Sequence, residues 1–302
     1  MTEEPKVCVL IATYNGANYL AEQLESIADQ TYKNIALLVS DDGSTDDTLA
    51  ILEEYKKKID IKVVNNTNTH GAFANFFNAM RNAPKADFYA FSDHDDVWNK
   101  DKIQKMVDVI KNEKEPALVY SDSEIVDENL QPNGQTFVRM NNYYLKPGSE
   151  LKQLLVSNYI QGCAMLFNKA LFDKLDKYPN PSFAHDWWVA VSSALLGKIF
   201  FINEPLHKYR QHSNNAVGKG KSALAKLGNI AALRKQWQKD NKLSLMQAKK
   251  LVELYSKSDR IEIVKQYIDI FNNQKGFKRK RAMTSAGFNT IKKVSMNRFL
   301  LG

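Results

Sequence analysis

The chain of 302 residues is long enough for one large domain or a domain with an appendage, and its hydrophobic content of 44% is typical of a globular protein with a sizeable core. No apolar run reaches the length of a membrane-spanning helix, which argues against an integral helical membrane protein. The net charge of +8 is unevenly distributed, because residues 219–302 hold 20 Lys and Arg against 5 Asp and Glu. A mildly acidic body therefore precedes a strongly basic tail, and we expect that tail to meet an anionic surface.

Strands and helices are expected to alternate through the first 122 residues. Continuous apolar runs predict buried strands at 7–13, 35–39, 61–64, 87–92 and 117–120. Amphipathic spacing predicts one helix after Gly16 and a second that begins near Ser44 or Thr45 and ends at about Lys58. Two further helices are expected over 73–81 and over 100–112. Such alternation favours a mostly parallel α/β sheet with helices on its faces.

The pattern changes after residue 122. Residues 122–146 are irregular and polar and predict a hairpin or flap. Further on we expect strands at 162–167, 199–202 and 206–209, and helices at 151–156, at 169–175 and from His185 to about 196. The polar stretch 213–220 is the best domain boundary, and the chain beyond it is helical and basic, with apolar residues at helical spacing over 224–237, 251–255, 261–271 and 291–300.

Acidic and polar residues follow two of the predicted strands. Three carboxylates lie within four residues at Asp93, Asp95 and Asp96, and Asp41-Asp42-Gly43-Ser44 follows an earlier strand. Carboxylates this close repel each other unless a cation neutralises them, and Mg²⁺ or Mn²⁺ prefers a few carboxylates together with phosphate oxygens. Taken alone, each motif also fits a solvated turn with a helix cap. Together with Thr13-Tyr14-Asn15-Gly16, at matching strand ends, they favour a nucleotide cleft.

Two later stretches carry candidate chemistry. His185-Asp186-Trp187-Trp188 opens a helix, where Asp186 is either a plain N-terminal cap or a general base beside aromatic side chains that suit a sugar. The cationic and aromatic stretch 207–212 follows a strand and could close over a diphosphate. Arg210 or His212 would then contact the leaving phosphate, although a loop histidine is more often merely solvated.

Several ordered segments of the chain carry a resemblance to one known family. The segments that carry it are 9–16, 30–32, 40–46 and 92–98, with 162–168 and 185–188 in support. They resemble glycosyltransferase family 2, and most nearly the bacterial rhamnosyltransferase-like enzymes of surface polysaccharide assembly. The resemblance covers about residues 6 to 215. It implies a GT-A fold, a Rossmann-like mixed sheet flanked by helices, with the basic helical region 219–302 as a C-terminal appendage.

The resemblance also implies a domain organisation and ligands. It places a catalytic domain at 1–218, with a nucleotide-sugar half at about 1–122 and an acceptor half at about 123–218. The donor would be a nucleotide-diphospho-sugar of rhamnose, glucose or galactose type, and the acceptor a saccharide or a lipid-linked saccharide. The implied cofactor is Mn²⁺ or Mg²⁺, and the reaction is an inverting transfer in polysaccharide biosynthesis.

Site residues follow from the same resemblance, position by position. Asp41 and Asp42 match the positions that contact the nucleotide base, near Thr13, Tyr14 and Asn15. Asp93 and Asp95 match the Asp-x-Asp pair, whose second member binds the divalent ion, and His212 is a further candidate ligand. Asp186 matches the catalytic base, but His185 stands where many members have Glu. The share of Asp96 in metal binding is left open, since it also suits a helix cap.

The sequence leaves two other functions open and also indicates a cellular location. A sugar nucleotidyltransferase shares the sheet and metal logic but usually has a Gly-rich phosphate loop, and a non-enzymatic protein could bind an anionic surface through the tail. The tail lacks a recognised nucleic-acid module, so we expect contact with an anionic membrane, a packed helical cap, or both. The acidic N-terminus lacks a signal-peptide layout, and Cys8 and Cys163 lie in apolar runs. We therefore expect a cytoplasmic protein with peripheral contact at the inner face of the membrane.

Overall fold

A computed structural model describes residues 4–143, 148–176, 179, 182–212 and 230–289. The chain divides into two compact units. The first consists of residues 1–140, 160–186 and 197–214, and the second of residues 141–159, 187–196 and 215–302. Segments that the sequence placed in an acceptor half at about 123–218 are thus shared between the two units. The predicted boundary at 213–220 lies outside the described residues.

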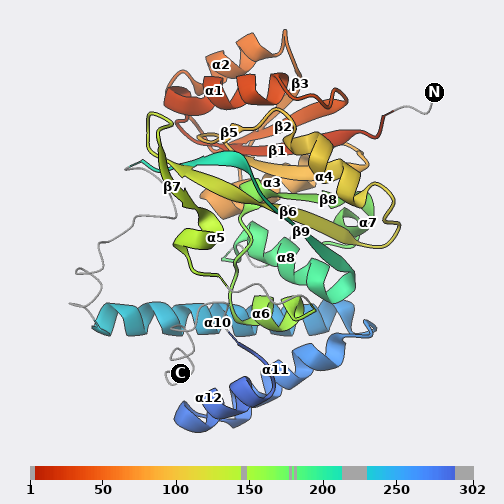
Figure 1. Ribbon diagram of the computed structural model, residues 1–302, viewed down its shortest axis with the longest axis vertical. Helices are drawn as coiled ribbons and strands as arrows, with labels where there is room; N and C mark the ends of the chain where they lie inside the picture. The colour runs from red at the N-terminus through yellow and green to blue at the C-terminus, as the bar shows by residue number, and fades with distance from the viewer. Residues whose placement is uncertain (1–3, 144–147, 177–178, 180–181, 213–229, 290–302) are drawn as a thin grey trace. The chain divides into compact units, whose positions relative to one another are not determined.

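The first unit is built on one mixed sheet (Figure 1). Its strands are β1 (Val7–Thr13), β2 (Ile35–Asp41), β3 (Asp60–Asn65), β4 (Phe88–Asp93), β5 (Val97–Trp98), β6 (Ala117–Val126), β7 (Pro132–Thr136), β8 (Met165–Asn168) and β9 (Lys198–Arg210). Their order is β3-β2-β1-β4-β8-β6-β9-β5, and β7 pairs with β6. The run from β3 to β4 is parallel, and β8 joins it to β6 by antiparallel pairing on both sides.

Helices cover both faces of this sheet. They are α1 (Ala17–Ala28), α2 (Thr48–Tyr55), α3 (Ala72–Asn82), α4 (Lys102–Ile110), α5 (Phe137–Met140) and α7 (Lys169–Phe172). Alternate residues of β1, such as Val9 and Ile11, pack with the apolar faces of α1 and α4 in one core cluster. On the opposite face, Phe76 of α3 meets Phe91 edge to face, with ring centroids 5.4 Å apart. Burial of β1 on both faces explains its uninterrupted apolar sequence.

The parallel strands bring their carboxyl ends to a common edge. Thr13 pairs with Asp41 across β1 and β2, and Ala12 pairs with Asp93 across β1 and β4. The loops that follow β1, β2 and β4 are therefore neighbours. This edge is where the sequence predicted a nucleotide cleft.

The second unit is helical. Its elements are α6 (Glu150–Val156), the part of α8 (His185–Leu196) from Trp187 onwards, α10 (Ile230–Tyr255), α11 (Ile261–Asn273) and α12 (Gly276–Ser285). The last carbonyls of α6 and α8 lack intrahelical partners and are satisfied by side chains from elsewhere in the unit. Ser244 Oγ donates to Leu155 O at 2.7 Å, and Ser258 Oγ donates to Leu195 O at 3.1 Å.

Most predicted elements are confirmed, and several differ from the prediction. The strands expected at 199–202 and 206–209 are one strand, β9, since both parts pair with β6 across a register shift near Asp122. The strand expected from Gly162 begins at Met165, because Gly162–Ala164 form a 3₁₀ turn. Residues 230–237 of the helical pattern at 224–237 join the pattern at 251–255 in one helix, α10, which holds neither Gly nor Pro between Ile230 and Tyr255, while residues 224–229 lie outside the described residues. The amphipathic segment 291–300 lies outside the described residues.

Within the described ranges, none of the helices combines the length and the apolar character that crossing a membrane requires.

Candidate active site

The turn after β2 is held by the Asp41 carboxylate. One of its oxygens accepts from Thr13 Oγ1 at 2.9 Å and from Ser44 Oγ at 2.6 Å, and the other accepts from the backbone N–H groups of Gly43 and Ser44 at 3.0 and 2.8 Å. Gly43 takes a φ of 86°, which L side chains rarely adopt. Four donors fill the acceptor sites of a carboxylate, so Asp41 shapes this turn.

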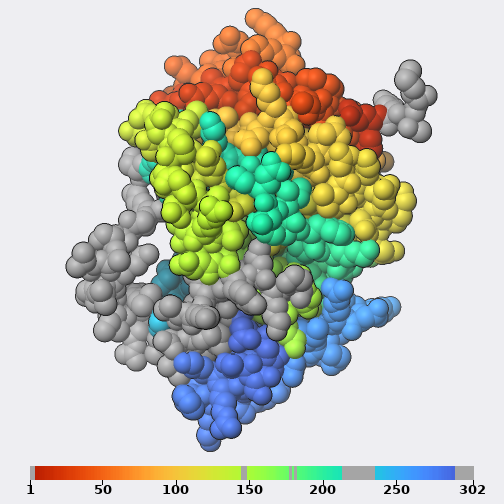
Figure 2. Space-filling model, in the orientation of Figure 1, coloured from red at the N-terminus to blue at the C-terminus, as the bar shows by residue number. Residues whose placement is uncertain are grey.

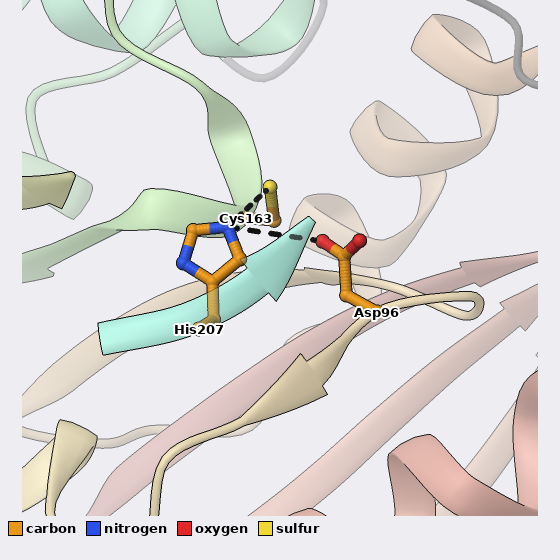
Figure 3. Close-up of side chains that lie close together, drawn as sticks. All are labelled: Asp96, Cys163 and His207. Atoms are coloured by element: carbon orange, nitrogen blue, oxygen red, sulfur yellow. Dashed lines mark hydrogen bonds and ion pairs between the residues drawn. The ribbon is translucent and has the colours of Figure 1, made fainter. Parts of the chain in front are cut away.

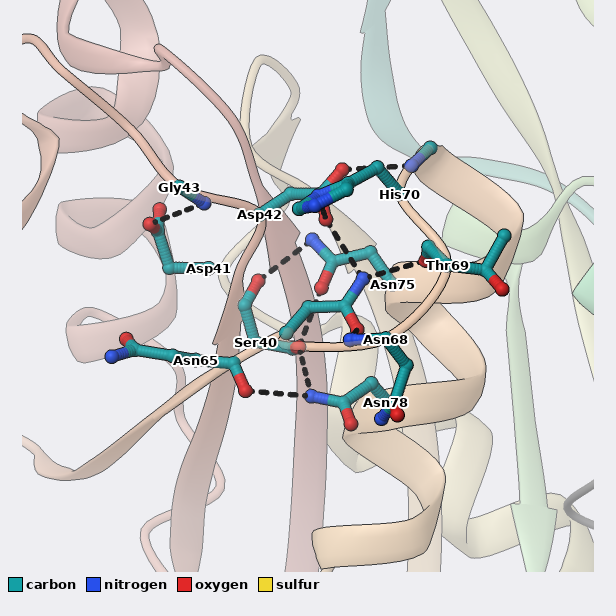
Figure 4. Close-up of polar contacts among 12 residues, drawn as sticks. Ser40, Asp41, Asp42, Gly43, Asn65, Asn68, Thr69, His70, Asn75 and Asn78 are labelled. Atoms are coloured by element: carbon teal, nitrogen blue, oxygen red, sulfur yellow. Dashed lines mark hydrogen bonds and ion pairs between the residues drawn. The ribbon is translucent and has the colours of Figure 1, made fainter.

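Asp42 belongs to a polar cluster at the same edge (Figure 4). Its Oδ1 accepts from Asn66 Nδ2 at 2.7 Å and lies 2.9 Å from His70 Nδ1, while its Oδ2 accepts from the Gly71 N–H at 2.8 Å. Asp42 therefore keeps acceptor capacity that Asp41 lacks. The His70 side chain is 69% exposed, so this pair lies at the surface of the edge.

The first loop and the acidic loop are packed together. Gly16 has no side chain, and a Cβ there would lie 2.6 Å from His94 Cδ2. His94 Nδ1 in turn lies 3.3 Å from the Ala12 carbonyl oxygen. Asn15 has a φ of 48°, and its Oδ1 accepts from the Thr45 N–H at 2.8 Å. Tyr14, which precedes Asn15 in the same loop, is 58% exposed, so its ring is available for stacking.

Asp93 and Asp186 lie within electrostatic reach of each other. Burial raises the pKa of Asp93 to about 7, and the charge of Asp95 and then that of Asp186 add to the rise. Carboxylates from β4, from the loop after it and from the start of α8 thus gather in one place. Such mutual repulsion is the situation that a bound cation relieves.

Asp95 is paired with His212. His212 Nε2 lies 2.8 Å from Asp95 Oδ2, and both side chains are largely buried. Asp95 comes from the loop after β4, whereas His212 comes two residues after β9 ends. Carboxylate and imidazole are both ligands of Mn²⁺-type ions, so this pair could supply two ligands of the predicted metal site.

Arg210 is almost fully buried and is engaged by oxygens of the protein. Its Nε donates to the Asp95 carbonyl at 2.8 Å, its Nη1 donates to the Glu128 carbonyl at 2.7 Å, and its Nη2 pairs with the Glu22 carboxylate. Its backbone N–H donates to Asp96 Oδ1 at 3.2 Å. The arginine thus holds the acidic loop in place, and its contact with a leaving diphosphate stays a prediction.

Tyr19 of α1 contacts both Arg210 and His212, the two residues that hold Asp95. The Arg210 guanidinium carbon is 4.5 Å from the centre of the Tyr19 ring, and the His212 ring centroid is 4.8 Å from it. A cation over an aromatic face is attracted by the ring quadrupole. The tyrosine therefore supports the same loop from the helix side.

Behind this loop lies a fully buried group of Asp96, Cys163 and His207 (Figure 3). Cys163 Sγ lies 3.3 Å from His207 Nε2, and Asp96 Oδ2 lies 3.9 Å from the same nitrogen. One ligand atom from each residue falls within 4.8 Å of the others, so the group could hold a metal ion. A Cys and His donor set suits Zn²⁺ better than the hard ions expected at a diphosphate.

A buried lysine stands beside this group. Lys102 Nζ donates to the Cys163 carbonyl at 2.5 Å and lies 4.1 Å from the Trp98 ring centre. Burial lowers the pKa of Lys102 to about 8, while the charges of Asp96 and Asp93 act in the opposite sense. The ammonium therefore supplies positive charge beneath the acidic loop. Burial, followed by the charge of Asp95, raises the pKa of Asp96 well above its usual range.

His185, which precedes the predicted base, is a buried neutral ring. It stacks on Phe76 with centroids 3.8 Å apart, and burial lowers its pKa to about 3. A Cβ on Gly162 would lie 2.7 Å from His185 Nε2 and 3.4 Å from Asp186 Cβ. Because Gly162 has no side chain, the 3₁₀ turn before β8 can approach the start of α8, and this close packing sets the position of Asp186.

The structure brings the predicted residues to one sheet edge in two groups. Thr13, Asn15, Asp41 and Asp42 are joined through the first two loops, and Asp93, Asp95, Asp186 and His212 through the acidic loop. Sequence reasoning missed His70, Tyr19, Glu22 and Lys102. Their spacing carried no signal, since a lone loop histidine or a helical lysine usually faces solvent.

Comparisons with known proteins show what the chain as a whole is similar to. The family model described as "Glycosyl transferase family 2" matches residues 8–174. The dTDP-rhamnosyl transferase RfbG of Shigella flexneri is 30% identical over 245 residues, covering 75% of this chain and 80% of that protein. An uncharacterized glycosyltransferase of Rickettsia typhi is 29% identical over 235 residues, covering 77% of this chain and 71% of its own length.

Solved structures show the same fold. TarS 1-349 of S. aureus, in complex with UDP-GlcNAc, matches with a TM-score of 0.60 at 20% identity, covering 89% of this chain and 72% of that one. The mannosyltransferase PcManGT of Pyrobaculum calidifontis, in complex with GDP-Man and Mn²⁺, matches with a TM-score of 0.58 at 16% identity, covering 95% and 74%.

Proposed function

The chain belongs to glycosyl transferase family 2, and from that premise we propose that it transfers a hexose, with inversion, from a nucleotide-diphospho-sugar to a saccharide or lipid-linked acceptor in cell-surface polysaccharide synthesis. It is a glycosyltransferase with a GT-A type fold. The observation that carries the finer proposal is the meeting of Asp93, Asp95 and His212 with Asp186 at one sheet edge.

Donor binding is assigned to the loops after β1 and β2. Tyr14 offers an exposed ring for the base, and Asp42 with His70 offers polar atoms at the same edge. RfbG is named for a dTDP-sugar, and TarS was solved with UDP-GlcNAc. These names support a pyrimidine nucleotide, whereas PcManGT was solved with GDP-Man. A hydrolysis screen of dTDP-, UDP- and GDP-sugars, each with Mn²⁺ and with Mg²⁺, identifies the donor without knowledge of the acceptor.

Asp95, His212 and Asp93 are the residues that would hold Mn²⁺ or Mg²⁺ at the diphosphate. A divalent ion bound there would offset the negative charge that develops on the leaving nucleoside diphosphate. Asp95 and His212 suit such an ion because they are ligand types that it accepts and already lie in contact, and a cation would also relieve the repulsion that Asp95 and Asp186 exert on Asp93. Asp95→Ala should abolish metal-dependent donor affinity in calorimetry with and without Mn²⁺. Unchanged affinity would show that the assignment is wrong.

Asp186 is assigned as the general base. Its carboxylate takes the proton from the acceptor hydroxyl as that oxygen bonds to the anomeric carbon. The bond from the anomeric carbon to the diphosphate oxygen breaks, and its electron pair leaves with the nucleoside diphosphate. Attack and departure on opposite faces invert the anomeric configuration. The place of Asp186 beside Asp93 supports this role, because it puts the base near the diphosphate end of a donor.

Asp186→Asn separates binding from chemistry. The amide keeps the size of the side chain but cannot accept the proton, so donor affinity should persist while transfer falls by at least about 100-fold, the lower end of general-base contributions. Asp259→Asn, at an exposed position, is the matched control and should keep full activity. Full turnover by Asp186→Asn would remove the base from the mechanism.

We also retain the proposal of peripheral contact with an anionic membrane through residues 219–302. It rests on the charge of this region and suits a lipid-linked acceptor.

A further inference from the structure

Helix α12 has one buried face and one exposed face. Met283 is fully buried and Arg279 is 4% exposed, with its guanidinium 4.5 Å from the centre of the Phe271 ring and its Nε donating to Gln274 O at 2.8 Å. Phe277 and Arg281 each lie two positions from Arg279, so at 3.6 residues per turn they point to the opposite side. Phe277 is 72% exposed, the highest value among the exposed large hydrophobic side chains of the described residues.

Cations surround this exposed phenylalanine. Lys275, Lys278 and Arg281 are exposed and Lys280 is partly exposed, all within four residues of Phe277. The sequence holds no Asp or Glu from Ile270 to Gly302, so the stretch around this phenylalanine is strongly basic. The helix lies in the dark blue part of the second unit, and its atoms reach the surface in the face drawn in Figure 2. We call Phe277, Lys275, Lys278 and Arg281 the α12 patch.

An exposed ring within a cationic cluster has a recognisable chemistry. A ring this exposed costs hydrophobic free energy in water, which burial in another apolar medium would recover. Cations around it select an anionic medium and attract it over about a Debye length, ~8 Å at physiological ionic strength. A second copy meeting this patch through a two-fold axis would bring like charges together, which opposes self-association.

We propose that the α12 patch binds an anionic phospholipid bilayer, with the Phe277 ring inserted among the lipids and the surrounding cations on the phosphate groups. Aromatic side chains lie at the level of the lipid headgroups at membrane interfaces, and clustered Lys and Arg are attracted to anionic lipids. This proposal narrows the general contact of residues 219–302 to one helix. It involves no step of the transfer reaction, so it can fail while the glycosyl transfer proposal stands.

The experiment is flotation of the full-length protein with vesicles of phosphatidylcholine alone or mixed with phosphatidylglycerol. We expect flotation with the anionic vesicles only, decreasing as salt rises. Phe277→Ala and the double variant Lys278→Glu/Arg281→Glu should each lower the apparent affinity, the latter by at least about 10-fold given ~1 kcal/mol per surface cation. The control Lys242→Glu/Lys249→Glu makes the same change of charge at exposed positions of α10 and should bind like the wild type.

Several outcomes would overturn the proposal. Equal flotation with neutral vesicles, or an equal loss in the α10 control, would show that no local anionic-lipid site exists. Light scattering that finds a dimer abolished by Phe277→Ala would make the patch an interface between copies. Retardation of RNA by the wild type, without vesicle binding, would assign it to nucleic acid. Thermal unfolding of each variant shows whether a loss of flotation is caused by a folding defect. Hydrolysis of a nucleotide-sugar, measured without vesicles, shows whether the enzyme is active independently of membrane binding.

Discussion

Arg210 binds the backbone of Asp95, because its Nε donates to the Asp95 carbonyl at 2.8 Å, whereas the Asp95 carboxylate pairs with His212. Arg210 therefore holds the backbone of the acidic loop, and His212 contacts the Asp95 side chain, which is the proposed metal ligand. Since Arg210 and His212 both lie against Tyr19, the three form one support for Asp95. Arg210 and Tyr19 would then tune the proposed metal site without touching the ion, whereas His212 is itself a proposed ligand.

Arg210→Lys should weaken Mn²⁺ binding. A lysine keeps the charge but cannot reach the Asp95 and Glu128 carbonyls and the Glu22 carboxylate at once, because it lacks the planar fork of donors. Loss of such an outer support typically costs about 10–100-fold in metal affinity. Titration of Mn²⁺ followed by electron paramagnetic resonance measures this without donor or turnover. Arg139→Lys, at an exposed arginine of the same unit, is the control. Wild-type Mn²⁺ affinity in Arg210→Lys would rule out the supporting role.

Gly162→Ala should lower turnover more than donor affinity. The new Cβ would lie 2.7 Å from His185 Nε2, and the ring cannot swing away because it is stacked on Phe76 at 3.8 Å. The start of α8 must then shift, and Asp186 shifts with it. Misplacement of a catalytic group by about 1 Å can cost ~100-fold in rate. Steady-state kinetics should show a fall in kcat with an almost unchanged KM for the donor, whereas an unchanged kcat would show that α8 absorbs the clash.

His185 should make the protein sensitive to acid. Its pKa is lowered to about 3 in the folded state by burial, against an ordinary value near 6.5. Between these two values the unfolded chain binds more protons, so stability rises with pH across this window and is lost as pH falls through it. The slope from this one group approaches about 1.4 kcal/mol per pH unit.

Urea unfolding of the wild type and of His185→Leu, followed from pH 7 to pH 4, measures this slope. The variant lacks the titrating ring, so its stability should decline less steeply by about one bound proton. Parallel pH profiles for the two proteins would mean that the ring gains a proton without cost in the fold.

The fold was predictable because its signals are local and repeated. Val7 to Thr13 reads as a doubly covered strand from its apolar run alone, and the loops after such strands meet at one edge by the geometry of parallel sheets. The candidate site was predictable where a carboxylate follows a strand, as with Asp95. Helix α12 went unassigned because its KGFKRKRAMTS stretch has only two buried positions, Arg279 and Met283.

The partners of the site residues were not predictable in the same way. Asp41 and Asp42 look alike in sequence, yet the fold fills the acceptor sites of Asp41 and leaves capacity on Asp42. Tyr19 and Lys102 support the acidic loop from helices distant in sequence, and no pattern within α1 or α4 indicates it. Contacts of this sort depend on how elements pack, which spacing along one chain does not encode.

Lys102→Met should lower the free energy of unfolding far more than Lys105→Met, a substitution one helical turn away. Lys102 is fully buried beside Asp96 and Cys163, so a methionine there leaves the buried carboxylates without their nearby cation. Removal of one partner from a buried charged group typically costs about 3–5 kcal/mol.

Lys105→Met, on the same helix, removes only partly exposed ion pairs with Asp101 and Glu204, which are worth about 0–1 kcal/mol. Urea unfolding of both variants gives the comparison, and the double variant Lys102→Met/Asp96→Asn tests its cause. If charge compensation is what Lys102 provides, the double variant should recover a large part of the loss, because it removes the uncompensated carboxylate as well. Simple addition of the two single losses would instead assign Lys102 a packing role.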